Sequence, residues 1–408
     1  MKTKLIFIIV ALSFMSCIGD LDVTNKSAVS SKSMWKEEGD AKAAMYGLYN
    51  QFRSTFSYGY FTWGEYRTGL WGDGLTGQTS RDQVYQNQIP TNHYFSDWTE
   101  LYTTINDANL IIKKVPIIHF NSENTKNEVL SNAYFVRAFC YYWIGRIWGD
   151  APLLLEGYES DSQEGLYPQR TSAERIFEQI GNDIDKAYKL IPDGIVKNRA
   201  SKASIAMLKA DYDLWMYKVR KSGDNYLQDA TEKIQSVLTN PAYGLENNYA
   251  DIFNDQPNKE VIFEWTFVQG EFTSSETENY LVPSQYVTTK YINNPIQTGS
   301  HQQWCFFTPS FKSFLTAIQA DQRAKMTFST FYDPDKEQTF QWINKFKGHW
   351  INNTRVFDSN ILVYRYADAV LFDAEIKLAK NNLQGAINAL NQIANRAYGI
   401  DNFYSNLT

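Results

Sequence analysis

The segment NEVLSNAYFVRAFCYYWIGRIWGDAPLL, residues 127–154, constrains the fold more than any other part of the sequence. Its apolar residues recur at helical spacing from Val129 to Ile147, and Phe135, Phe139 and Tyr142 form a second stripe beside the first. A helix that is apolar over so much of its circumference must be surrounded by other elements. The glycine and the proline of the following GDAP sequence predict where it ends.

The same period recurs elsewhere and predicts a mainly α chain. Thr171 and Glu174 form a capping-box pattern at the start of one helix. Two helix pairs have about the length of a tetratricopeptide unit, with small residues where the two helices would meet. These pairs fit a tetratricopeptide-like superhelix, and they also fit antiparallel helices of a bundle. The remaining predicted helices cover residues 40–54, 98–115, 171–190, 203–217, 226–237, 361–380 and 384–398.

Two long stretches, residues 57–97 and 243–360, lack the helical period. They are rich in aromatic, amide and glycine residues, and they are predicted to be irregular insertions with a few short strands. The segment EVIFEWTF, residues 260–267, is one such strand. Because binding residues are concentrated in loops held by a rigid frame, we expect function to lie in these insertions.

The N-terminus has the pattern of a lipoprotein signal peptide. Lys2 and Lys4 precede an apolar run from Leu5 to Met15, which is too short to span a membrane. The run ends at Ser16 and Cys17, as in the bacterial lipobox. We therefore predict that residues 1–16 are removed and that Cys17 is lipidated, so that the domain of residues 17–408 is held at a membrane surface.

Composition excludes several classes of function. A net charge of −6 and an isoelectric point near 5.4 argue against nucleic acid as a partner. The four histidines have no metal-ligand spacing, and neither a metal nor another cofactor is expected. Cys140 and Cys305 lie too far apart in sequence to indicate a disulfide framework, and both are expected to be free.

Several segments, in order, resemble the SusD/RagB family of outer-membrane nutrient-binding lipoproteins. They include CIGDLDV after the signal, AYFVRAFCYYWIGRIWGDAPLL, RASKASIAMLKADYDLWMYK and RYADAVLFDAEIKLA. The resemblance implies a SusD-like frame of tetratricopeptide-like helix pairs. It also implies a non-catalytic, lipid-anchored protein on the outward face of the outer membrane that holds a glycan above a SusC-like TonB-dependent transporter.

The insertions contain residues suited to glycan binding, because sugar C–H groups stack on aromatic rings while amides and carboxylates bind hydroxyl groups. Any one of these rings could instead pin a loop to the helices. The rings and polar partners selected as the candidate glycan site are Trp71, Tyr85, Tyr286, Tyr291 and Trp304, with Asp73 and Gln303.

Three other interpretations concern a phosphate-loop pattern, a pair of carboxylates and the helix pairs. GDGLTG, residues 72–77, matches a phosphate-loop pattern but lacks the flanking strand and helix of a dinucleotide site. Glu65 and Asp73 could act as the acid and base of a glycoside hydrolase. A helical-repeat scaffold that binds a peptide or a protein is the third possibility, and it would not need the insertions.

Overall fold

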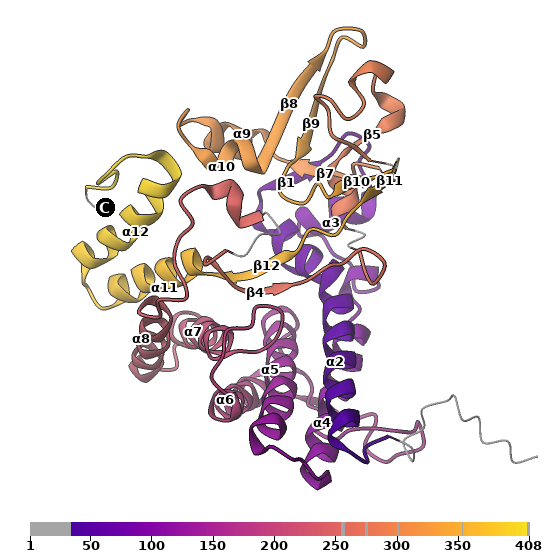
Figure 1. The fold of residues 1–408 in the computed structure, drawn as a ribbon, viewed down its shortest axis with the longest axis vertical. Coiled ribbons are helices and arrows are strands. Elements are labelled where there is room, and N and C mark those ends of the chain that lie inside the picture. Colours follow the sequence, from indigo (N-terminus) through magenta and orange to yellow (C-terminus); the bar gives the residue numbers. More distant parts are fainter. Residues whose placement is uncertain (1–33, 254–257, 274–275, 300–301, 353, 406–408) are drawn as a thin grey trace, which may run out of the picture.

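The structure is a computed structural model that describes residues 34–253, 258–273, 276–299, 302–352 and 354–405. The predicted signal peptide and Cys17 lie outside the described residues. Figure 1 shows a helical frame in its lower half and a loop-rich part with short strands above it. None of the helices described combines the length and the apolarity needed to cross a bilayer.

The frame is built from helices that pack against one another in pairs, as the predicted fold class requires. Helix α5 packs against α4 and α6, α7 against α8, and α11 against α12, while α11 also contacts α8 (Figure 1). The mainly α, tetratricopeptide-like prediction is confirmed. The frame helices are α2 (Glu38–Gly59), α4 (Thr99–Lys114), α5 (Glu123–Ile147), α6 (Ala173–Leu190), α7 (Lys202–Lys218), α8 (Asp224–Leu238), α11 (Tyr366–Ala379) and α12 (Leu383–Tyr398).

Helix α5 is the centre of this frame, as its two apolar stripes predicted. Phe135, Phe139 and Tyr142 are all buried, together with the residues of the first stripe from Val129 to Cys140. Fully burying one such side chain stabilises the fold by about 1.5–3 kcal/mol. After the helix, Gly149 has a φ of +72°, a left-handed conformation that favours glycine and turns the chain away.

The predicted cap of α6 is wrong. The helix begins after Ser172, not Thr171, and neither side chain caps it. Instead the carboxylate of Asp150 accepts a hydrogen bond of 2.8 Å from the backbone N–H of Ala173. The cap therefore comes from a loop folded back over the helix start, where β2 (Ala151–Pro152) pairs with β3 (Arg170–Thr171), and a local pattern does not reveal it.

Residues 361–365 form a strand, although they were predicted to begin a helix. Strand β12 (Ile361–Arg365) pairs antiparallel with β4 (Val261–Trp265), which confirms the strand predicted from EVIFEWTF. The sequence ILVYR has the branched and aromatic residues that suit a strand, and β4 supplies its partner. This two-stranded ribbon lies between the frame and the loop-rich part in Figure 1.

The first insertion is more regular than predicted. Helix α2 extends to Gly59 and runs into a π-helical turn (η1, Tyr60–Gly64) and a 3₁₀ turn (η2, Glu65–Thr68). Aromatic side chains on several sides of this segment hide any single apolar stripe, so its helical period is not visible in the sequence. The insertion continues with β1 (Trp71–Asp73), α3 (Thr79–Tyr85) and the turn η3 (Tyr94–Ser96) before α4.

The second insertion contains a hairpin and several short elements. Strands β8 (Phe328–Asp333) and β9 (Gln338–Ile343) pair antiparallel and project at the top of Figure 1. The other elements from the end of α4 onward are η4 (Val115–Ile117), η5 (Tyr249–Phe253), η6 (Thr277–Tyr280), β5 (Val282–Pro283), η7 (Ser284–Tyr286), η8 (Thr289–Tyr291), β6 (Thr298–Gly299), β7 (Cys305–Phe307), α9 (Pro309–Thr316), α10 (Gln322–Thr327), β10 (His349–Ile351) and β11 (Thr354–Val356).

Candidate functional site

The two insertions meet where β1 pairs with β7, a region that we call the insertion junction. Trp71 lies opposite Phe307 and Asp73 opposite Cys305 in an antiparallel register. The backbone N–H of Gly74 then donates to the carbonyl of Trp304 at 3.1 Å. This pairing gathers Trp71, Asp73, Gln303 and Trp304, which come from distant parts of the chain, into one region.

Gly74 makes this close approach possible. A Cβ at position 74 would lie 2.4 Å from the carbonyl oxygen of Gln303 and 2.9 Å from the backbone nitrogen of Cys305. Gly77, three residues on, has a φ of +59°. The glycines of the GDGLTG segment therefore serve backbone contact and a turn.

Three of the predicted site residues are buried in the junction. Trp71 is 7% exposed, with its ring centroid 4.6 Å from that of Phe307. Gln303 joins two segments, because its amide oxygen accepts from the N–H of Leu75 at 3.2 Å and its amide nitrogen donates to the carbonyl of Gln341 at 2.9 Å. The geometry gives Trp71 and Gln303 roles in packing and positioning.

Tyr85, the third, is also buried, and its hydroxyl lies between the carboxylates of Asp73 and Asp82. Burial raises the pKa of Tyr85, and the hydrogen bonds to the two carboxylates raise it further. Tyr85 therefore stays a neutral hydrogen-bond donor that fixes the orientation of Asp73, and Asp73 itself is exposed to solvent.

The other three predicted rings are partly exposed to solvent. Tyr286 is 41% exposed on η7, and Tyr291 is half-buried on η8, with its ring edge-on to Phe331 at 4.9 Å. Trp304 is half-buried and carries the guanidinium of Arg81 at 4.0 Å over its ring. Tyr94, which is 67% exposed, was not among the predicted rings, because sequence patterns do not reveal which loop rings stay uncovered.

A buried ion pair supports Trp304. The Arg81 Nη2 atom lies 2.7 Å from Oε2 of Glu276, and both side chains are almost completely buried. Arg81 also donates to the hydroxyl of Tyr58 at 3.0 Å, and Tyr66 donates to Glu276. Burial raises the pKa of Glu276, and the positive charge of Arg81 opposes this rise. The pair links the first insertion to the second beside the Trp304 ring.

A polar hollow of about 220 Å³ opens beside these groups, and we call it the junction cleft. Within it, Lys312 Nζ donates to the side-chain oxygen of Gln341 at 2.6 Å. Among the described residues, no carboxylate lies within ion-pair distance of Lys312. The cleft is lined by Asp73, Gly74, Leu75, Val282, Gln303, Phe306, Phe307, Pro309, Lys312, Thr339, Phe340 and Gln341.

Lys312 and Gln341 were not predicted. Neither stands in a motif, and only the fold of the second insertion brings them to Asp73. Burial lowers the pKa of Lys312. The junction cleft thus combines an exposed carboxylate, an ammonium group, an amide and the side chain of Phe307.

A second hollow, the aromatic cavity, has a volume of about 390 Å³. It shares only Phe307 with the junction cleft. Glu65 lines the aromatic cavity and Asp73 lines the cleft, so the structure does not bring these two carboxylates into one cavity. The aromatic cavity is lined by Tyr60, Phe61, Glu65, Leu70, Trp71, Tyr249, Phe253, Tyr280, Phe307, Phe311, Thr327, Ile343, Lys345, Phe346, Leu362, Val363, Tyr364, Arg365, Asp368 and Phe372.

Two other kinds of site are a metal centre and a reactive cysteine. In the ranges that the structure describes, no group of three or more histidine, cysteine or acidic side chains is placed to hold a metal ion. Cys140 and Cys305 are both buried free thiols, and burial raises the pKa of each. A buried thiol with a raised pKa is a poor nucleophile.

Comparison with known proteins agrees with this architecture. Residues 27–210 match a SusD-like family model described as "Starch-binding associating with outer membrane". The SusD-like protein P38 of Formosa agariphila is 26% identical to this chain, over 93% of the chain and 78% of that protein. The SusD-like protein P2 of the same organism is also 26% identical, over 97% of the chain and 81% of that protein.

Solved structures show the same fold. B. fragilis NanU superposes with a TM-score of 0.81 at 24% identity, over 91% of this chain and 79% of that one. A SusD superfamily protein from Bacteroides vulgatus gives 0.78 at 24% identity, over 90% of this chain and 80% of that one. The chain is therefore similar in sequence to SusD-like proteins, and its fold matches that of SusD superfamily structures.

Proposed function

We propose that the protein is a non-catalytic glycan-binding protein and that the junction cleft is its saccharide site. The observation that carries the proposal is the set of groups in the cleft. Asp73 and Lys312 line one hollow without forming an ion pair with each other, beside the side chain of Phe307. A sugar hydroxyl can donate to Asp73 while another accepts from Lys312, and charge-assisted hydrogen bonds of this kind are about twice as strong as neutral ones.

The open rings extend this site. Trp304 at the junction and Tyr286 on η7 of the second insertion offer exposed ring surface for further sugar units. A chain of several units would contact both the cleft and the rings, so that weak contacts add up within one ligand. The family description, which names starch binding and association with the outer membrane, supports a carbohydrate as the ligand.

The setting of the protein is the second part of the proposal. We infer that Cys17 carries lipid, that the protein lies on the outward face of the outer membrane, and that it delivers its glycan to a SusC-like TonB-dependent transporter. Tethering raises the local concentration of a weakly bound oligosaccharide above such a transporter. Changing Cys17 to Ala should move the protein from the membrane fraction to the soluble fraction, and retention in the membrane would refute the anchor.

Calorimetry against a panel of oligosaccharides tests the binding site. Asp73→Asn and Lys312→Met should each weaken binding of the best ligand at least tenfold. Asp161→Asn, an exposed loop change outside the cleft, is the matched control and should leave binding unchanged. The proposal fails if no glycan binds, or if both cleft variants bind like the parent protein.

The hydrolase alternative is tested with the same ligands. Because Glu65 and Asp73 line different cavities, we expect no sugar to be released from a bound glycan over hours. Release of reducing sugar that is abolished by Glu65→Gln or Asp73→Asn would show that the protein is an enzyme instead.

A further inference from the structure

We propose that the aromatic cavity is a second saccharide site, which receives one uncharged sugar ring between Glu65 and Lys345. The inference takes its ligand class from the proposed function, but it concerns other residues. Its volume of about 390 Å³ lies within the range of natural ligand pockets, about 300–1,000 Å³. It opens between the first insertion, η5 and the start of α11.

Two polar groups of this cavity form no ion pair with a described residue, although Lys345 hydrogen-bonds to the hydroxyl of Tyr249. The Glu65 carboxylate makes no hydrogen bond or ion pair with any described residue, and Lys345 forms no ion pair with a described carboxylate. The Lys345 ammonium lies over the rings of Phe253 and Tyr249, at 5.5 and 5.7 Å from their centroids. Both groups sit among aromatic side chains, where unmade hydrogen bonds are costly.

The electrostatics agree with this geometry. Burial raises the pKa of Glu65, and the positive charges of Lys345 and Arg365 oppose the rise. The indole N–H of Trp71, another residue of the cavity lining, is buried without a hydrogen-bond partner in the described part of the chain. Among the described residues, the cavity therefore contains an acceptor, Glu65, and a donor, the Trp71 indole, that the fold leaves unused, beside the Lys345 ammonium and aromatic walls.

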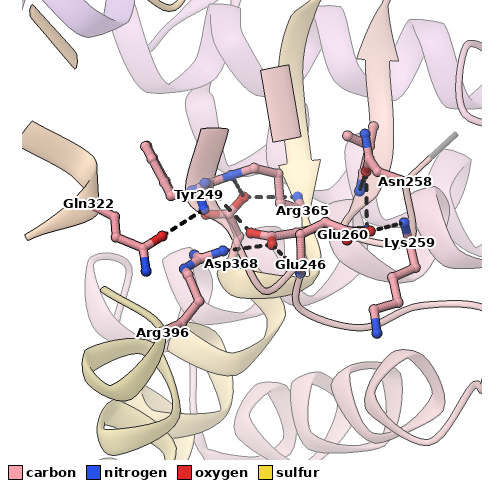
Figure 2. A network of polar contacts seen from close by, with 10 residues as sticks. Glu246, Tyr249, Asn258, Lys259, Glu260, Gln322, Arg365, Asp368 and Arg396 are labelled. Carbon is pink, nitrogen blue, oxygen red and sulfur yellow. Dashed lines mark hydrogen bonds and ion pairs between the residues drawn. The ribbon is translucent and has the colours of Figure 1, made fainter. Parts of the chain in front are cut away.

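The other two charges of the cavity are used by the fold. Arg365 donates to Asp368 at 3.0 and 3.2 Å, and Figure 2 shows this pair beside Tyr249. In the same network, Arg396 of α12 donates to Glu260 at 2.8 Å. These contacts fix one wall of the cavity, so Glu65 and Lys345 remain as the groups that can bind a ligand.

The presence of both a negative and a positive group in the cavity favours an uncharged ligand. A carboxylate-bearing sugar would meet Glu65, and an amino sugar would meet Lys345 and Arg365. A neutral sugar can donate one hydroxyl to Glu65 and accept from Lys345 with another, while its C–H groups contact the rings of Tyr249 or Phe346.

The test uses the full chain and a panel of glucose, galactose, mannose and xylose, with glucuronic acid and glucosamine as charged counterparts. Saturation-transfer NMR identifies binding, and titration gives the affinity. At least one neutral sugar should bind, and Glu65→Gln and Lys345→Met should each weaken it at least tenfold. Lys345→Arg keeps the charge and should retain part of the affinity.

Matched variants separate this inference from the proposed function. Asp73→Asn and Lys312→Met, in the junction cleft, should change binding of the monosaccharide by less than twofold. If every saccharide responds only to the cleft variants, the second site is refuted and the proposed function stands. If saccharides respond only to the cavity variants, the junction proposal fails instead. Tighter binding of glucuronic acid than of glucose would refute an uncharged ligand, and thermal unfolding checks that each variant is folded.

Discussion

The buried pair between Arg81 and Glu276 gives the sharpest prediction about how the site is held. Both side chains are withdrawn from water, and the closest contact between them is 2.7 Å. Removing one partner of a buried pair costs about 3–5 kcal/mol, because the other charge is left without compensation. The Arg81 contact over the Trp304 ring, at 4.0 Å, adds about 1–2 kcal/mol.

We therefore expect Arg81→Met to lower the free energy of unfolding by about 4 kcal/mol. The double variant Arg81→Met with Glu276→Gln removes both charges, and it should recover about 2–3 kcal/mol of that loss. Glycan affinity should fall in the single variant, because Trp304 loses the Arg81 guanidinium that packs against its ring.

Urea denaturation followed by tryptophan fluorescence measures these differences across the double-mutant cycle. The matched control is Lys290→Met, which breaks an exposed ion pair with Asp335 at 2.7 Å and should cost less than about 1 kcal/mol. A loss below about 1 kcal/mol for Arg81→Met, or single-variant losses that simply add in the double variant, would refute the reasoning.

Three further predictions concern the junction, the frame and the thiols. Gly74→Ala should destabilise the protein by about 1–3 kcal/mol and weaken glycan binding, because its Cβ would meet the Gln303 backbone. In the control Gly72→Ala, the new Cβ meets only a methyl group at 3.6 Å, so the free energy of unfolding measured in urea should change by less than about 0.5 kcal/mol. Burial raises the pKa of Asp107 to about 6, above the unfolded value of about 3.9, so its contribution to stability is complete below about pH 4 and is lost as the pH rises through 6. Asp107→Asn should gain about 1–2 kcal/mol over the parent at pH 7.5 but nothing at pH 4, a difference that Asp161→Asn should not show and that thermal unfolding measures. Cys140 and Cys305 should react with a thiol reagent only in denaturant, and rapid labelling of the native protein would contradict their burial.

The frame could be predicted because its signals are local. The stripes on α5 and the paired helices near the end of the chain depend on residues three or four positions apart, and such spacing is readable in one sequence. The errors arose where a distant segment decided the outcome. Asp150 replaced Thr171 as the source of the cap for α6, and β4 drew residues 361–365 into a strand.

The site was less predictable for the same reason. Trp71 and Tyr286 are both aromatic residues of irregular insertions, yet one is buried against β7 and the other is exposed on a turn. The difference is set by the pairing of β1 with β7, which joins residues more than two hundred positions apart. Lys312, Gln341 and Lys345 carry no motif at all, so only the folded chain shows that they line hollows.

The many aromatic residues of the chain can either hold loops in place or bind a sugar, and the charged residues beside a ring distinguish these two roles. Irregular segments lack the hydrogen-bond ladder of a helix, and buried rings such as Trp71 and Tyr66 hold them in place instead. A ring alone is therefore weak evidence for a sugar site. Asp73 and Lys312 line the junction cleft without an ion pair between them, and Glu65 and Lys345 line the aromatic cavity in the same way. Opposite charges that form no ion pair with each other do not stabilise the fold by attraction. A ligand with several hydroxyl groups, which can bind both charges, is the simplest physical reason for their arrangement.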